Sequence, residues 1–280
     1  MDDKAIVITG ANGQVGRALQ KVYPQALALD REQLDITDQK AINEFNWDNV
    51  KVIINAAAWT DVDGAENPSN YSLVKAVNVD ATRYLATAAN QRDLTFVTFS
   101  SDYVFDGSQP IHNEDESFSP LNIYGKTKAD GDLAAATTIK HYIIRTSWVI
   151  GDGRNFVNIM QDLAARGVKP SVVNDQIGRL TFTDTLARGI KHLLEIGAPY
   201  GTYNLTNEGQ PVSWADIAKI VFEKSGKSPS DVQPVSTAEY FADKPNTAKR
   251  PLQSTLDLTK IEKTGFIPED WRDKLDKLLG

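Results

Sequence analysis

Short runs of β-branched and aromatic residues alternate with longer amphipathic stretches through the first half of this 280-residue chain. The runs are AIVIT (5–9), ALALD (26–30), VKVIINAA (50–57), LTFVTFS (94–100) and HYIIRTS (141–147). Continuous apolar strands separated by helices are typical of a parallel sheet covered on both faces. Right-handed crossovers make such a sheet doubly wound, and its ligands bind where the strands end. The sequence therefore predicts an α/β fold of the Rossmann type, with its site residues directly after strands.

The alternation becomes irregular beyond about residue 150. Helical patterns at 155–166, 183–196, 213–226 and 271–279 are separated by short strand-like runs at 170–174 and 201–206. We expect a dinucleotide-binding domain over residues 1–150. Residues 151–280 are expected to form mainly a smaller α/β substrate-binding lobe, with some segments returning to the first domain.

Charge and composition exclude several classes of protein. The 30 basic and 37 acidic residues give a net charge of −7, which disfavours a nucleic-acid-binding protein. Without cysteine there is neither a disulfide nor a thiolate metal site, and His112, His141 and His192 lie too far apart for zinc spacing, so we expect no metal. The first residues do not resemble a secretion signal, and no run approaches the roughly 20 apolar residues of a membrane span. We expect a cytoplasmic protein that is not associated with a membrane.

A glycine-rich turn follows the first apolar run, with glycines at positions 10, 13 and 16. Glycines between a strand and a helix allow the backbone to approach a pyrophosphate, whose charge lies at the helix N-terminus. The spacing is G-x-x-G-x-x-G and differs from the G-x-G-x-x-G fingerprint, so the motif alone is weak evidence. Its place after the first strand favours a dinucleotide site at Gly10, Gly13 and Gly16.

The second apolar run ends in Asp30, followed by Arg31. A carboxylate at this position can accept hydrogen bonds from a ribose, as in NAD-binding proteins. A guanidinium there can instead bind the 2′-phosphate of NADP. The two residues favour opposite cofactors, and we expect NADPH, with NADH as the alternative.

Three further residues suit proton transfer to a carbonyl. Ser101 follows the fourth apolar run, and Tyr124 and Lys128 lie four residues apart on a predicted helix opened by Ser119-Pro120. Residues i and i+4 share a helix face, and a nearby ammonium lowers the pKa of a phenol towards neutrality. Lys128 could serve both the phenol and a cofactor ribose, while the Ser101 hydroxyl holds the substrate oxygen. The sequence therefore predicts a reductase in which Tyr124 supplies the proton.

Several blocks that occur in order along the chain carry a family resemblance. They are GANGQVG, VIINAAAWTDVDGAE, SSDYVFDG, SPLNIYGKTK, RTSWVIG, NDQIGRLT and RPLQSTL. The chain resembles the extended short-chain dehydrogenase/reductase family, and within it the reductases of the C4 ketone of dTDP-4-dehydro-L-rhamnose, whose product dTDP-L-rhamnose enters cell-surface polysaccharides. The resemblance implies an NAD(P)H-dependent oxidoreductase with a dTDP-sugar substrate.

The resemblance also assigns residues. It implies Ser101, Tyr124 and Lys128 as catalytic residues. Besides the turn glycines and the Tyr124–Lys128 pair, it implies cofactor contacts from Gln14, Val15, Asp30, Asp35, Ile36, Ala58, Trp59 and Thr60. It implies substrate contacts from Ser101, Asp102, Tyr124, Trp148, Asn155, Arg179 and Arg250.

The chain departs from the family pattern at several positions. Some family members dimerise through magnesium held partly by a carboxylate in the helix after the glycine turn, where this chain has Ala18. We therefore expect a monomer or a weak dimer that does not depend on metal. Gly64 and Leu180 replace a lysine and a proline that are common in the family.

Two alternatives remain open. One is another nucleotide-sugar epimerase or reductase of the same superfamily; a dehydratase is disfavoured because Asp102 is followed by Tyr103 and not by a second acid. The other is a non-catalytic, NADP-binding regulatory subunit, which the presence of both Tyr124 and Lys128 disfavours.

Overall fold

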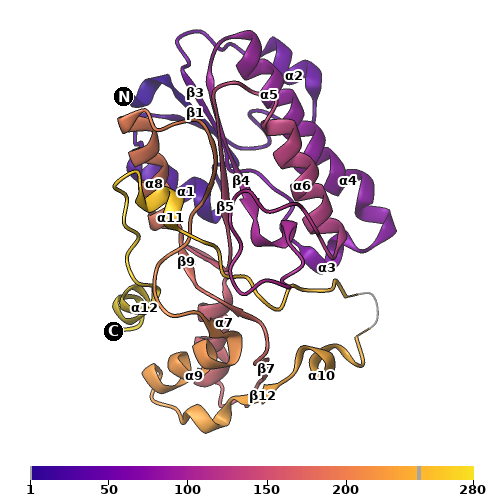
Figure 1. Ribbon diagram of the computed structural model, residues 1–280, viewed down its shortest axis with the longest axis vertical. Helices are drawn as coiled ribbons and strands as arrows, with labels where there is room; N and C mark the ends of the chain where they lie inside the picture. Colours follow the sequence, from indigo (N-terminus) through magenta and orange to yellow (C-terminus); the bar gives the residue numbers. More distant parts are fainter. Residues whose placement is uncertain (1, 245–246) are drawn as a thin grey trace.

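The computed structural model describes residues 2–244 and 247–280. Its centre is a parallel sheet of six strands in the order β10-β5-β4-β3-β1-β2 (Figure 1). Every neighbouring pair in this sheet is parallel, which confirms the predicted Rossmann-type fold. The strands are β1 (Ile6–Thr9), β2 (Leu27–Leu29), β3 (Val52–Asn55), β4 (Thr95–Ser101), β5 (His141–Thr146) and β10 (Gly201–Asn204).

Helices cover both faces of this sheet (Figure 1). On one face, α1 (Gln14–Val22) and α8 (Thr183–Ile196) pack on the strands through a core that includes Leu19 and Leu186, and α11 (Thr259–Glu262) adds Ile261. On the other face, α2 (Gln39–Glu44) and α5 (Ala81–Gln91) contribute Ile42 and Leu85 to a second core. The helix α6 (Ile123–Ala135) packs beside α5, and α3 (Val62–Ala65) and α4 (Tyr71–Lys75) pack against α6. The continuous apolar strands are thus buried between two helical layers, as their composition predicts.

A second cluster of elements lies below the carboxyl ends of the strands (Figure 1). Its core joins apolar residues of α7 (Phe156–Ala165), α9 (Trp214–Lys224) and α12 (Trp271–Leu279). Short strands pair around it: β7 (Ser171–Val173) with β12 (Gln233–Val235), β8 (Ile177–Gly178) with β11 (Val212–Ser213), and β6 (Val149–Ile150) with β9 (Thr181–Phe182). The helix α10 (Thr237–Phe241) follows β12. This part of the molecule therefore faces the edge of the sheet where ligands bind in such folds.

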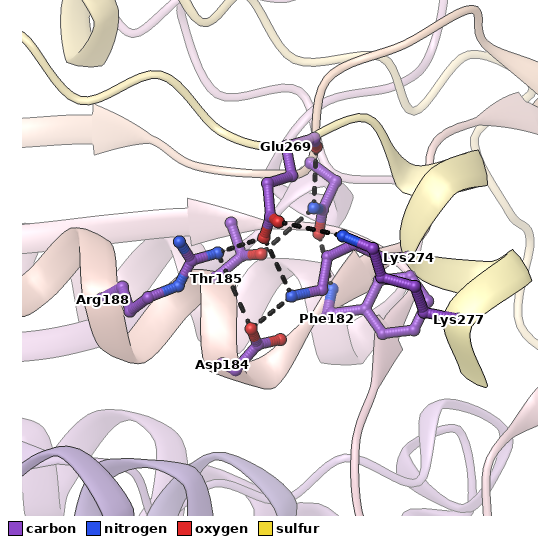
Figure 2. Close-up of polar contacts among 8 residues, drawn as sticks. Phe182, Asp184, Thr185, Arg188, Glu269, Lys274 and Lys277 are labelled. Carbon is purple, nitrogen blue, oxygen red and sulfur yellow. Dashed lines mark hydrogen bonds and ion pairs between the residues drawn. The ribbon is translucent and has the colours of Figure 1, made fainter.

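The chain crosses between these two parts more than once. Beyond residue 150, β10 adds an edge strand to the large sheet beside β5, and Leu186 and Leu258 join the core that holds Ile6. The C-terminal helix is tied back to α8 by charged side chains (Figure 2): Glu269 pairs with Arg188 at 2.5 Å and with Lys274 at 3.1 Å, and Lys274 also pairs with Asp184. The first half of the chain is therefore packed together with segments from the second.

Two helices differ from the sequence prediction. The helix that carries Tyr124 begins at Ile123, so the predicted start at Ser119-Pro120 is wrong. Asn122 caps it instead, because its side chain accepts a hydrogen bond from the Gly125 N–H at 2.7 Å. The stretch between α4 and α5 contains one π-helical segment, Ala76–Asp80. Within residues 2–244 and 247–280, no helix combines the length and apolarity that crossing a bilayer requires.

Candidate active site

A cleft of about 670 Å³ lies at the carboxyl ends of the strands. The turn after β1 forms one wall, the segment after β4 and the first turns of α6 form another, and the chain after β5 closes the third. Among the expected site residues, the cleft brings together Gly13, Gln14, Val15, Ala58, Thr60, Ser101, Asp102, Tyr124, Lys128 and Trp148. Residues from five separate segments thus converge on one cavity.

The glycine turn is shaped by close backbone approach. Gly10 has a φ of 72°, and a Cβ atom there would lie 2.5 Å from the Ala57 nitrogen. A Cβ atom on Gly16 would lie 2.2 Å from the Gly10 carbonyl oxygen. No side chain caps the helix that follows Gly13, so its first N–H groups point towards the cleft without a partner from a capping residue. The turn can therefore hold an anion against the helix N-terminus.

Tyr124 and Ser101 meet in the interior of the cleft. Burial raises the pKa of the Tyr124 phenol, and a hydrogen bond with the Ser101 hydroxyl works in the opposite direction. Ser101 also donates to the Asp102 carboxylate at 2.9 Å. Burial raises the pKa of Asp102 to about 6, partly offset by its hydrogen bonds. Tyr124 is therefore a protonated phenol at neutral pH, ready to donate to an oxygen placed beside it.

Lys128 is almost completely buried on the next turn of α6. Its ammonium donates to the Phe99 carbonyl oxygen at 2.6 Å. The Tyr124 pKa is raised and is not lowered towards neutrality as expected: burial dominates it, and the acidic Asp102 and Asp132 raise it further. Burial also lowers the pKa of Lys128 itself, and Asp132 opposes that effect. The i, i+4 spacing still places Lys128 and Tyr124 on the same helix face.

A smaller pocket of about 260 Å³ adjoins the glycine turn on the side of β2. It holds Asp30, Arg31, Asp35 and Ile36 from the expected cofactor set, together with Gly10. Asp30 accepts hydrogen bonds from the backbone N–H groups of residues 32 and 33 and from the Asn12 amide. Arg31 is exposed and pairs with Asp35 at 3.1 Å. The carboxylate of Asp30 therefore stabilises the turn that follows β2. The exposed side chain of Arg31 can move towards a ligand.

An outer pocket of about 390 Å³ lies beyond the cleft, between α7, β7 and residues 240–244 and 247–250. Arg250 lines it and pairs with Asp63 at 2.7 Å, and its guanidinium lies 4.7 Å from the centre of the Phe241 ring. Lys244 lies over the Tyr240 ring. Aromatic walls with two cations beside them suit a flat base joined to phosphates.

Two residues that the sequence did not single out shape this region. Trp214 lines both the cleft and the outer pocket, and its ring stacks on that of Trp148. Asn78 lies in the π-helical segment. Its side chain accepts a hydrogen bond from the backbone N–H of Trp59 at 2.9 Å and donates one to the Thr127 hydroxyl at 3.1 Å. Asn78 therefore ties the loop after β3 to the helix of Tyr124. A helical irregularity of this kind often marks a functional site, but its sequence carries no clear signal.

Four expected contact residues lie outside these cavities. Trp59 does not line them, and its indole N–H donates to the Asp61 carbonyl oxygen at 2.8 Å. Asn155 caps α7 and donates to the Gly151 carbonyl oxygen at 2.8 Å. Arg179 lines a separate pocket with Glu208, and the structure does not bring it to the cleft. Gly16 also does not line the cavities, because it packs beneath Gly10.

Within the described part of the chain, no group of three or more His, Cys, Asp or Glu side chains is placed to hold a metal ion. A doubly wound sheet, a glycine turn at an uncapped helix and a buried Ser-Tyr-Lys set on one cleft together define an NAD(P)-dependent short-chain dehydrogenase/reductase.

Comparison with known proteins narrows this class. Residues 4–280 match the family model described as the RmlD substrate binding domain. A dTDP-4-dehydrorhamnose reductase of Aggregatibacter actinomycetemcomitans is 40% identical, over 98% of this chain and 97% of its own. The crystal structure of a Clostridium acetobutylicum dTDP-4-dehydrorhamnose reductase has a TM-score of 0.89 and 37% identity, with 97% of each chain covered. A Bacillus anthracis dTDP-4-dehydrorhamnose reductase in complex with NADP has a TM-score of 0.88 and 33% identity, again with 97% of each chain covered. The chain belongs to the dTDP-4-dehydrorhamnose reductase family.

Proposed function

We propose that this protein transfers a hydride from NADPH, or less readily from NADH, to the C4 ketone of dTDP-4-dehydro-L-rhamnose and releases dTDP-L-rhamnose for cell-surface polysaccharide synthesis. The observation that carries the proposal is the convergence of Ser101, Tyr124 and Lys128 on the cleft that also contains the glycine turn. The substrate is inferred from the names of the relatives and from the outer pocket.

The residues present fit a bound dinucleotide. The Oε1 atom of Gln14 and the hydroxyl oxygens of Thr146 and Ser147 are buried along the cleft, and none has a hydrogen-bond partner among residues 2–244 and 247–280. The uncapped N-terminus of α1 would hold the pyrophosphate, and the pocket beside β2 would hold the adenosine. When bound, the reduced nicotinamide supplies the hydride.

Tyr124 acts as the general acid. Its phenol donates a proton to the C4 oxygen of the sugar, and the Ser101 hydroxyl holds that oxygen in place. The Lys128 ammonium, on the same helix face, stabilises the phenolate that Tyr124 becomes when it gives up its proton, and it also reaches towards the cofactor ribose. A buried site strengthens each of these charge interactions relative to water.

The outer pocket accounts for the nucleotide half of the substrate. Arg250 and Lys244 would meet the diphosphate, and Tyr240 and Phe241 would contact the base. Trp148 and Trp214 lie between this pocket and the cleft, where the sugar must pass. Residues 1–150 would thus bind mainly the cofactor, and residues 151–280 mainly the substrate.

Two diffusible nucleotides as reactants suit a cytoplasmic enzyme without a nucleic-acid or membrane partner. We further propose that the protein is a monomer or a weak dimer that forms without metal, because Ala18 replaces the carboxylate that would help to hold a bridging ion.

The test is a direct assay of the purified protein. Loss of the near-ultraviolet absorbance of NADPH in the presence of dTDP-4-dehydro-L-rhamnose, with dTDP-L-rhamnose identified by mass and NMR spectroscopy, would support the proposal. Tight NADPH binding with no turnover would instead indicate a regulatory subunit. Formation of an epimer with oxidised cofactor alone would indicate another enzyme of the superfamily.

A further inference from the structure

The ammonium of Lys128 lies in a cluster of buried charges beneath the cleft. Asp132 follows Lys128 by one helical turn on α6, and its carboxylate pairs with Arg145 of β5 at 3.1 Å. The side chains of Asp132 and Arg145 are 4% and 5% exposed, and Lys128 is 7% exposed. Three ionisable groups are therefore held out of water within one helical turn and the neighbouring strand.

Arg145 is fixed from several sides. Its guanidinium donates to the Glu114 carbonyl oxygen at 2.9 Å and lies 5.3 Å and 5.0 Å from the ring centres of Phe105 and Phe118. Burial raises the pKa of the Asp132 carboxyl, and the charges of Arg145 and Lys128 oppose that effect. Because a guanidinium does not lose its proton in a protein, its ion pair with Asp132 favours the carboxylate form. The cluster therefore contains one permanent cation, one anion and Lys128.

Lys128 depends on this anion. An ammonium moved out of water tends to lose its proton unless an opposite charge lies nearby. The Phe99 carbonyl accepts one of its three N–H groups, and in the described part of the chain Asp132 is the single charged group that favours its protonated form.

We propose that Asp132 is a positioning residue that acts through Lys128: anchored by Arg145, it keeps the Lys128 ammonium charged and aimed at Tyr124 and the cofactor ribose. This inference rests on the proposed reductase function, because it assigns a role only to a Lys128 that serves catalysis. Neither the comparisons nor the sequence assigned a role to Asp132.

Other charged groups near the cleft have to be separated from this effect. The negative charge of Asp132 also acts on Tyr124, whose pKa it raises, and so does Asp102 of the 3₁₀ turn after β4. Replacement of Asp132 by Asn would remove this direct effect and at the same time deprotonate Lys128. The two effects on the Tyr124 phenol are opposite in sign, so kinetics alone is insufficient.

The decisive measurement is therefore the titration of Lys128 itself. Protein labelled with ¹³C at the lysine side chains would be followed by NMR over pH, with the Lys128 signal assigned from its absence in Lys128→Arg. In Asp132→Asn the titration of Lys128 should move to clearly lower pH than in the parent. The matched control is Asp130→Asn, an exposed carboxylate on the same helix, which should leave it unchanged. An unchanged titration in Asp132→Asn would overturn the proposal, whether or not the protein is a reductase.

Kinetics provides the second arm. In Asp132→Asn, kcat at about pH 8 should be about tenfold or more below that of the parent, since one unit of pKa corresponds to a factor of ten. The loss should diminish as pH falls, because Lys128 regains its proton in acid. A loss that is equal at all pH values would mean a merely structural role. Asp132→Glu, which keeps the carboxylate, should recover most of the rate.

Breaking a buried ion pair can prevent folding, so a second variant is needed. The double variant Asp132→Asn/Arg145→Gln leaves no unpaired guanidinium and lacks the same anion. Circular dichroism would establish that it is folded, and its Lys128 should titrate as low as in the single variant. A Lys128 titration like that of the parent in this folded double variant would also refute the proposal.

Discussion

Trp148 and Trp214 stack with their ring centres 3.7 Å apart and their planes inclined by 17°. Trp148 does so from a left-handed backbone conformation, with a φ of 48°, which is a costly state for a bulky residue. Phe156 also packs against Trp214, with ring centres 4.4 Å apart. This stack fixes the wall between the cleft and the outer pocket.

Removal of the Trp214 ring should weaken substrate binding more than it slows the chemical step. In Trp214→Leu, we expect KM for the dTDP-sugar to rise about three- to tenfold, as for the loss of an aromatic pair worth about 0.5–1.5 kcal/mol. The Kd for NADPH should stay the same, because Trp214 lies at the outer end of the cleft. Steady-state kinetics and fluorescence titration would measure the two constants. A fall in kcat with an unchanged KM would contradict this role.

Replacement of Tyr124 by Phe keeps the ring and removes the acid. General acids typically contribute 10²–10⁴-fold, so kcat should fall by about that factor while NADPH binding is retained. Ser101→Ala should lower the rate through loss of substrate orientation. If Tyr124→Phe reduces the ketone as fast as the parent, the assignment of the proton donor is wrong.

Lys128→Met should behave differently from Tyr124→Phe, because Lys128 has two proposed contacts. We expect weaker NADPH binding through the lost ribose contact, and an alkaline limb of the rate profile that moves to higher pH because the phenolate loses its ammonium. Binding by calorimetry and rates over pH would test both effects. Unchanged cofactor affinity would remove the ribose contact from the proposal.

Arg31 should decide the preference between NADPH and NADH. Its side chain is exposed and pairs with Asp35 at the surface, so it can turn towards a 2′-phosphate. In Arg31→Ala, we expect kcat/KM for NADPH to fall about tenfold, as for a lost charge-assisted hydrogen bond worth about 1.5–3 kcal/mol, and kcat/KM for NADH to stay almost constant. Equal losses with both cofactors would show that Arg31 does not read the 2′-phosphate.

Asp102 should make the protein less stable as pH rises. Its pKa is about 6 in the folded protein and 3.8 when unperturbed, so the folded state holds the proton more tightly. The stabilisation is complete below about pH 4 and is lost as pH rises through about 6. Asp102→Asn mimics the protonated acid, and it should exceed the parent in free energy of unfolding near pH 8 by up to about 3 kcal/mol. Urea unfolding at several pH values would measure the difference, which should vanish in acid.

Removal of metal should have no effect on rate. Proton donation by Tyr124 and hydride transfer from the cofactor need no Lewis acid, so dialysis against a chelator should leave kcat unchanged. Sedimentation with and without magnesium would test the expected independence of any dimer from metal. A large loss of activity that magnesium restores would show that carboxylates of the protein hold a functional ion.

The order of elements was readable because each strand of the central sheet is a continuous apolar run. The same order placed Ser101 and Tyr124 at one edge, since Ser101 ends strand β4 and Tyr124 lies on the helix that follows it in a doubly wound sheet. The groups that interact with Tyr124 and Lys128 were harder to predict from the sequence. The phenol pKa depends on burial, and the Asp132–Arg145 pair joins a helix to a strand, so neither is encoded in local spacing.

Contacts that form only when distant segments pack were missed for the same reason. Trp214 of α9 stacks on Trp148, which follows β5, and Asn78 of the π-helical segment contacts Trp59 and Thr127. Arg179 was predicted to contact the substrate from the family motif alone, and its side chain lines a different pocket. Local patterns predict which strand end a residue follows, whereas the direction of its side chain is set by packing.

The return of β10 to the sheet and the shared core limit how this enzyme can be recombined. A chain cut at residue 150 would leave β5 as a bare edge and would remove Leu186, Leu205 and Leu258 from the core around Ile6. An unpaired apolar edge promotes aggregation, so such a fragment is a poor module for grafting. New sugar specificities are therefore more accessible by point substitutions around the outer pocket than by exchange of the second half, in the laboratory and in evolution alike.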